Sequence, residues 1–157
     1  MNEPKKNPAL TRALNLLSKR SYSEKRLREK LSEKDLELRD IDAAVVRLKD
    51  LKFLDDARFA QSLSREMAEF RHFGPRRIYM ELIKKGIPKD LARETTDNIE
   101  YSFDESLEEV LKKYLKKCLN VPREKIFNRA LGYMVRRGFD FGSSRDKLLL
   151  YLKNPET

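Results

Sequence analysis

The sequence repeats itself with a period of about 50 residues, and this feature constrains the fold more than any other. Two apolar residues one helical turn apart, Leu27 and Leu31, have counterparts in Ile78 and Leu82. A motif of two basic residues, a glycine and an apolar residue also occurs twice at this spacing, and its second copy ends at Phe139. Internal repetition of this kind is typical of a tandem array, in which each small unit packs mainly against its neighbours.

The repeating unit is predicted to be a group of three helices. Apolar residues recur at helical spacing along most of the chain, and the alternation typical of strands is missing. We therefore predict an all-α fold, an elongated, curved tandem array of three three-helix repeats with helix-turn-helix-like units. The predicted repeats are 9–54, 55–101 and 102–153, with flexible termini at 1–8 and 154–157. One irregular helical bundle with accidental internal similarity is the alternative.

The first two repeats are predicted to meet at residues 51–60. Phe53 and Leu54 are apolar and should close the first repeat. Asp55 or Asp56 should cap the next helix by accepting hydrogen bonds from its first free N–H groups, where negative charge is also favoured. The stretch is therefore interpreted as a joint between repeats.

Other helix ends have recognisable signals. Ser21 with Glu24 fits a capping box at the start of the second helix, and Ser143 or Ser144 can cap the last one. Gly86 suits a left-handed helix stop. In the first repeat, Asp35 stands where the other repeats place this glycine. Aspartate tolerates a left-handed backbone less well than glycine but better than most residues, so this turn is expected either to keep its left-handed form or to be longer.

Composition points to thin cores and an anionic partner. Charged residues make up 39% of the chain and apolar residues another 39%, which suits stacked helices better than one thick globule. The formal net charge is +9, and the excess is spread along the chain. Such a surface attracts polyanions, with nucleic acid as the first candidate.

The sequence also predicts where the protein works. Cys118 is the single cysteine, so no internal disulfide can form and a reducing compartment is expected. The chain begins with polar residues that resemble no secretory signal, and its longest apolar runs are far too short to span a membrane. These features predict a soluble, cytoplasmic protein.

Four stretches of the sequence together match a known pattern: the first-repeat segment 26–31, the Leu-Asp-Asp-x-x-Phe-Ala stretch within 54–60, Gly74 with 81–87, and the Arg-Arg-Gly-Phe motif at 136–139. On these residues the chain resembles the RecX family, bacterial regulators of the RecA recombinase. The resemblance covers roughly residues 9–152.

The resemblance implies a modular, curved molecule that docks into the helical groove of the RecA filament on single-stranded DNA. It further implies a negative regulator that suppresses ATP hydrolysis, strand exchange and RecA-dependent repressor cleavage. Nonspecific contact with single- or double-stranded DNA is expected to assist, and the protein is expected to be a monomer. A stand-alone helix-turn-helix-like DNA-binding protein is the alternative function.

Catalytic groups are scarce. The single histidine, His72, is interpreted as a loop residue or one near a helix C-terminus, and Cys118 as part of an apolar helix face that starts near Phe103. Asp55 and Asp56 are better explained as caps than as metal ligands. The sequence therefore predicts a non-enzyme with no metal site and no cofactor.

Basic residues form the candidate surface for RecA or DNA. Those near helix C-termini also stabilise their helices, and any single one can be an ordinary solvated residue. Tyr22, Phe73 and Tyr79 could stack on bases beside them, although aromatic residues in thin repeats are more often core. The candidate cations are Lys25, Arg26, Arg28, Lys30, Arg71, Arg76, Arg77, Lys84, Lys85, Lys112, Lys113, Lys116, Lys117, Arg136 and Arg137.

Overall fold

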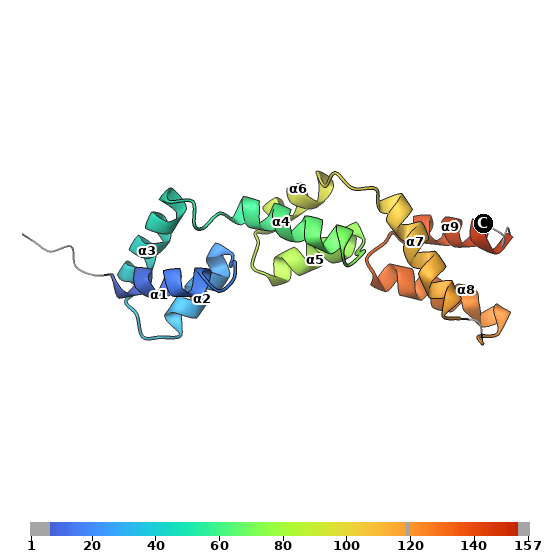
Figure 1. Ribbon diagram of the computed structural model, residues 1–157, viewed down its shortest axis with the longest axis horizontal. Coiled ribbons are helices and arrows are strands. Elements are labelled where there is room, and N and C mark those ends of the chain that lie inside the picture. The colour runs from blue at the N-terminus through green and yellow to red at the C-terminus, as the bar shows by residue number, and fades with distance from the viewer. Residues whose placement is uncertain (1–6, 119, 154–157) are drawn as a thin grey trace, which may run out of the picture.

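The computed structural model describes residues 7–118 and 120–153. Within these ranges the chain forms nine helices and no strand. The helices are α1 (Pro8–Leu17), α2 (Glu24–Ser32), α3 (Leu38–Asp50), α4 (Asp56–Glu69), α5 (Pro75–Lys84), α6 (Lys89–Asp97), α7 (Phe103–Lys116), α8 (Arg123–Arg136) and α9 (Phe141–Lys153). They lie in three groups of three along an elongated, curved molecule (Figure 1).

Each group of three helices has its own small core. Helices pack chiefly against the other two of their group. Leu27 and Leu31 are fully buried in the first core, as are their counterparts Ile78 and Leu82 in the second. Phe103 packs against both the second and the third core and so connects them. The predicted all-α tandem array of three-helix repeats is confirmed.

The predicted flexible termini lie almost wholly outside the described residues. Asn7 and Pro8 are exceptions, because both belong to the start of α1. The Asn7 side chain accepts the Leu10 N–H at 3.0 Å, and Pro8 is the first helical residue. At this position a proline loses no intrahelical bond, since its missing N–H would have no partner in the helix.

The second helix is capped by a different serine from the one that the sequence predicts. Helix α2 begins at Glu24, so its cap is Ser23, whose Oγ accepts the Arg26 N–H at 3.3 Å. The capping box with Ser21 is therefore wrong. The predicted caps of the last helix are wrong as well, because α9 already begins at Phe141 and the Asp140 carboxylate accepts the Ser143 N–H at 3.1 Å.

Both aspartates of the joint act as caps, but on different helices. Asp55 accepts the Arg58 N–H at 3.0 Å and caps its own helix, α4. Asp56 accepts the Glu24 N–H at 2.8 Å, which is the first N–H of α2. Of the two apolar residues before them, only Leu54 is buried. Phe53 is 60% exposed and does not close the first repeat.

Repeats one and two meet at a contact that we call the first junction. Here the start of α2 lies against the turn that ends α5. Ser23 Oγ donates to the Lys85 carbonyl at 2.6 Å, and Arg26 Nη2 donates to the Lys84 carbonyl at 2.8 Å. A Cβ atom on Gly86 would lie 2.7 Å from Ser23 Oγ, so this close approach requires glycine.

Repeats two and three meet in the same way at the second junction. The Gly74 N–H donates to the Arg137 carbonyl at 2.8 Å, and Arg77 Nη1 donates to the Arg136 carbonyl at 3.2 Å. A Cβ atom on Gly138 would lie 2.3 Å from the Arg77 backbone nitrogen. The sequence repeat is therefore also a repeat of the contact that joins neighbouring units.

The surroundings of the turn in the first repeat explain why it holds Asp35 in place of a glycine. Asp35 adopts the same left-handed backbone as the glycines of the other two turns, with φ of 51° against 89° at Gly86 and 94° at Gly138. Its side chain is exposed, whereas both glycines are buried beneath the preceding repeat. The left-handed form of the turn is therefore kept at Asp35, and no close approach forbids a side chain at this position.

We expect Gly138→Ala to weaken the protein more than a comparable change at Asp35. At Gly138 a methyl group adds a collision with Arg77 to the left-handed penalty of about 1–2 kcal/mol, so the total loss should be about 2 kcal/mol or more. Asp35→Ala is the control, because this position already holds a side chain, and it should cost less than about 1 kcal/mol. Urea unfolding followed by circular dichroism measures both. Equal losses would contradict the proposed role of the glycine.

Candidate functional site

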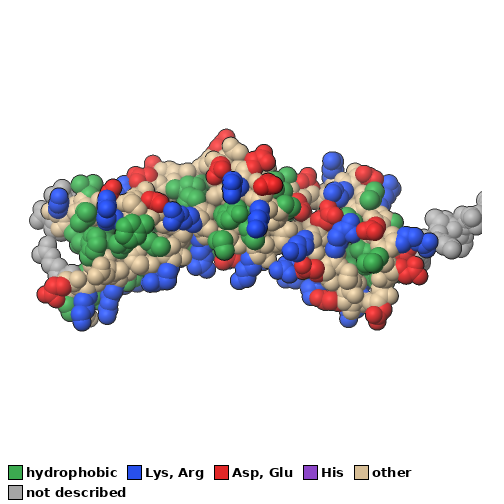
Figure 2. Space-filling view, turned by 180° about the vertical axis from the view of Figure 1, so that it is seen from behind, with side chains coloured by type: hydrophobic (Ala, Val, Ile, Leu, Met, Phe, Trp, Pro, Cys, Tyr) green, Lys and Arg blue, Asp and Glu red, His purple; other side chains and the backbone are tan. Residues whose placement is uncertain are grey.

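The predicted cations are distributed along the whole molecule. Figure 2 shows Lys and Arg side chains over its full length, interleaved with Asp and Glu. The structure divides the candidates into three classes by what their charged groups contact: junction arginines, ion-paired cations and open cations. Among the described residues, the open cations and the junction residue Arg137 form no ion pair with a carboxylate, and of these only the open cations are exposed.

The junction arginines are Arg26, Arg77 and Arg137. Besides the carbonyl bonds already described, Arg137 Nη2 donates to the carbonyls of Arg71 and His72, the latter at 3.2 Å. The guanidinium groups of Arg77 and Arg137 lie 4.6 and 5.0 Å from the centre of the Phe73 ring. These arginines therefore hold neighbouring repeats together, and Phe73 is occupied by them.

The ion-paired cations each contact a carboxylate. Arg28 is held by Asp42 at 2.5 Å and Glu24 at 3.0 Å, and Arg76 contacts Asp140 across the second junction at 3.0 Å. The other pairs are Lys30–Glu33, Arg71–Glu66, Lys112–Glu108 and Lys113–Glu109. Exposed pairs of this kind contribute little to stability, but they offset the positive charge locally.

The open cations are exposed and form no ion pair within residues 7–118 and 120–153. They come from all three repeats. Three of them lie at the ends of α5 and α8, where positive charge also favours the helix dipole. The open cations are Lys25, Lys84, Lys85, Lys116, Lys117 and Arg136.

The other residues that the sequence points to lie in a core or beside a helix end. Tyr79 packs partly buried against the second core. Cys118 is buried, but it lies beyond the end of α7 and not on the helix as predicted. His72 follows α4 with φ of 49°, and its Nδ1 lies 3.9 Å from a Glu109 oxygen. Across the described ranges, no group of three or more His, Cys, Asp or Glu side chains could hold a metal ion.

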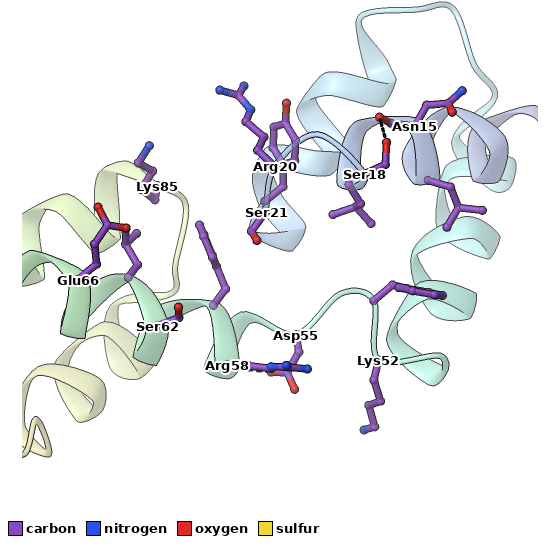
Figure 3. A pocket seen from close by; sticks show the side chains of 16 residues that line it. Asn15, Ser18, Arg20, Ser21, Lys52, Asp55, Arg58, Ser62, Glu66 and Lys85 are labelled. Atoms are coloured by element: carbon purple, nitrogen blue, oxygen red, sulfur yellow. Dashed lines mark hydrogen bonds between the residues drawn. The ribbon is translucent and has the colours of Figure 1, made fainter.

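A groove between the first and second repeats is not predicted by the sequence (Figure 3). It encloses about 970 Å³. Its lining includes the cations Arg20, Arg58 and Lys85 and the aromatic residues Tyr22, Phe53 and Phe59. The groove could have been predicted only if the sequence had indicated that Phe53 is exposed. An apolar residue beside a joint is normally assigned to the core, and its sequence does not distinguish it from its buried neighbour Leu54.

Two family models match the chain. The model of the first three-helix domain of RecX matches residues 9–48, and that of the second matches residues 55–95. The regulatory protein RecX of Chlorobaculum tepidum is 30% identical over 152 residues, which cover 97% of this chain and 93% of that protein. The chain belongs to the RecX family.

Relatives in this family differ in length, and a solved structure from the family has a similar fold. The RecX of Bacillus velezensis is 34% identical over 136 residues, covering 85% of this chain; the matched region is 51% of that protein, so the chain spans about half of its length. The crystal structure of RecX from Lactobacillus salivarius has a TM-score of 0.81 at 23% identity and covers 92% of this chain and 94% of that one.

The helices of the described ranges are also too short or too polar for a membrane. Among them, none combines the length and the apolar character needed to cross a bilayer. This finding agrees with the short apolar runs of the sequence.

We expect acid to weaken the first repeat through Glu24. Its carboxylate accepts bonds from Lys49 at 2.9 Å and Arg28 at 3.0 Å, and the Lys49 bond is the main reason why the Glu24 pKa lies below its ordinary value of 4.5. A carboxylate whose pKa falls on folding stabilises the fold at pH values above its unfolded-state pKa. This stabilisation is lost as the pH falls through the pKa of the folded state. The free energy of unfolding should therefore fall as the pH drops below about 4.5. The fall should be less steep in Glu24→Gln.

Asp56 is the control, because its contribution to stability should change with pH in the opposite direction. Burial is the main reason why the pKa of Asp56 is raised, so its contribution to stability increases as the pH falls. Asp56→Asn should therefore steepen the acid loss, and unfolding titrations at a series of pH values compare the three proteins. Identical pH profiles for all three would contradict this assignment.

Proposed function

We propose that the chain is a negative regulator of RecA. In this proposal a cytoplasmic monomer binds in the helical groove of the RecA filament on single-stranded DNA and inhibits its ATPase, strand-exchange and coprotease activities. Nonspecific DNA contact by the open cations assists binding. The protein acts by occupying a surface and not by catalysis.

The elongated arrangement of the repeats is the observation that best supports this proposal (Figure 1). Membership of the regulatory protein RecX family supports it as well. A helical filament presents the same groove over a long distance, and tandem repeats suit such a target because they extend in one dimension. Open cations from every repeat can then contact phosphates or acidic side chains at several points along it.

The alternative of a stand-alone helix-turn-helix protein receives less support. A recognition helix contacts base edges with its N-terminal residues, which must approach the negatively charged DNA. The third helix of each of the first two groups carries an acidic side chain in its first turn, next to a basic one, Arg39 or Lys89. Asp40 and Asp42 lie near the start of α3, and Asp90 lies in the first turn of α6. These charges oppose phosphate contact at the position where a recognition helix needs it.

A titration of RecA ATPase on single-stranded DNA tests the proposal. The protein should lower the DNA-dependent ATPase at concentrations that leave naked DNA largely unbound, which a DNA-alone binding measurement at equal salt determines. Inhibition that appears only once the naked DNA is saturated would instead indicate simple competition for DNA. No inhibition, together with tight sequence-specific duplex binding, would favour the alternative.

Two lysine pairs on and beside the end of α7 allow a matched comparison. Replacing Lys116 and Lys117 by Gln should weaken filament binding and flatten its salt dependence, by up to about 1 unit of log–log slope for each phosphate that the protein no longer binds. The control replaces Lys112 and Lys113, whose charges are already offset by Glu108 and Glu109 at 2.8 and 2.6 Å, and should have a smaller effect. Co-sedimentation with the filament at several salt concentrations measures both. Equal effects would remove the distinction between paired and open cations.

A further inference from the structure

The groove between the first and second repeats combines positive charge with aromatic rings (Figure 3). One wall is formed by the end of α1 and the loop to α2, and the other by α4 and the end of α5. Figure 3 shows Arg20 on the first-repeat wall and Lys85 on the second-repeat wall, across the gap from each other. Arg58 lies beside Asp55 at the base of the groove.

The charge in the groove is open. In the described part of the chain, Arg20, Arg58 and Lys85 form no ion pair, and all three are exposed. The two lining carboxylates are otherwise engaged: Asp55 accepts the first-turn N–H of α4, and Glu66 is paired with Arg71 at 3.0 Å. Lys52 also lines the groove, but it points away from the gap in Figure 3 and has no part in the proposed site.

The aromatic rings offer faces for stacking. Phe53 is 60% exposed at the joint. Tyr22 and Phe59 are half-buried and fixed by their packing, and the Arg20 guanidinium lies 4.6 Å from the centre of the Tyr22 ring. Rings held by a folded framework stack on a ligand without losing much side-chain freedom.

We propose that this groove binds single-stranded nucleic acid, with phosphates between Arg20 and Lys85 and a base stacked on Phe53. The proposal rests on the nucleic-acid part of the function proposed above and assigns it a site. Exposed aromatic rings beside open cations form the combination that single-strand binders use, because every base has a face that can stack. Duplex DNA presents its bases already stacked, so a duplex can use only the cations. An acidic peptide would leave Phe53 without a role.

The test measures binding of a fluorescent oligothymidylate of about 20 nucleotides to the full chain. Phe53→Ala should weaken binding about 5-fold or more, and Arg20→Gln with Lys85→Gln should reduce the log–log salt slope by about 0.7 for each phosphate that is no longer bound. Phe70→Ala is the control for an exposed ring outside the groove, since Phe70 is 78% exposed. Arg93→Gln is the control for an exposed cation on α6 that forms no ion pair with the described residues. Both controls should bind like the original protein.

Photo-crosslinking adds a readout of position. An oligonucleotide that carries bromodeoxyuridine should crosslink to the segment 53–58, which trypsin releases as one peptide, and to the segment that contains Tyr22. Circular dichroism of each variant verifies that loss of binding does not come from unfolding.

Several results would overturn the proposal. These are no measurable binding of the oligonucleotide, equal binding by Phe53→Ala and Phe70→Ala, tighter binding of a duplex of the same length, or displacement of the oligonucleotide by polyglutamate with no dependence on Phe53. The RecA ATPase titration is run in parallel. Unchanged oligonucleotide binding by Phe53→Ala would contradict the proposed binding site in the groove but not the proposed regulation of RecA. Absence of ATPase inhibition would contradict the regulation of RecA but not the binding site.

Discussion

The structure depends on one contact made twice: the carbonyls of a basic-basic-glycine turn accept hydrogen bonds from the start of the middle helix in the preceding repeat. At the first junction the donors are Ser23 and Arg26, and at the second they are Gly74 and Arg77. Each bond contributes only about 0.5–1.5 kcal/mol. Because the bonds join turns and helix ends directly, however, they fix the direction in which each repeat follows the last, and they make the array a single elongated body.

This contact also explains why two different sequences serve the same position. The first N–H of α2, at Glu24, receives the Asp56 carboxylate from the joint. The corresponding first residue of α5 is Pro75, which has no N–H to satisfy. The two junctions thus avoid an unsatisfied first N–H at the start of the middle helix in two ways.

The sequence was sufficient for the repeat and its cores, because helical periodicity and left-handed glycine stops are local signals. It was not sufficient where a contact between repeats decides the outcome. Ser21 and Ser23 both look like caps, but only Ser23 also reaches the carbonyl of Lys85. The division of the cations could be predicted only in part: Lys112 and Lys113 pair with glutamates one helical turn away, but the contacts of Arg28 with Asp42 and of Arg76 with Asp140 join residues that are distant in sequence. The groove could not be predicted because nothing in the sequence indicates that Phe53 is exposed and Leu54 buried. The two residues follow a left-handed turn at Lys52, with φ of 59°.

The proposed functions all require a stiff, extended array that offers charge along its length and a groove at a junction. Small-angle X-ray scattering of the protein in solution tests this shape most directly. A compact domain of this length has a radius of gyration of about 15 Å. We expect a clearly larger value, with the asymmetric distance distribution of a rod-like particle. A value near that of the compact domain, with a symmetric distribution, would contradict the extended array.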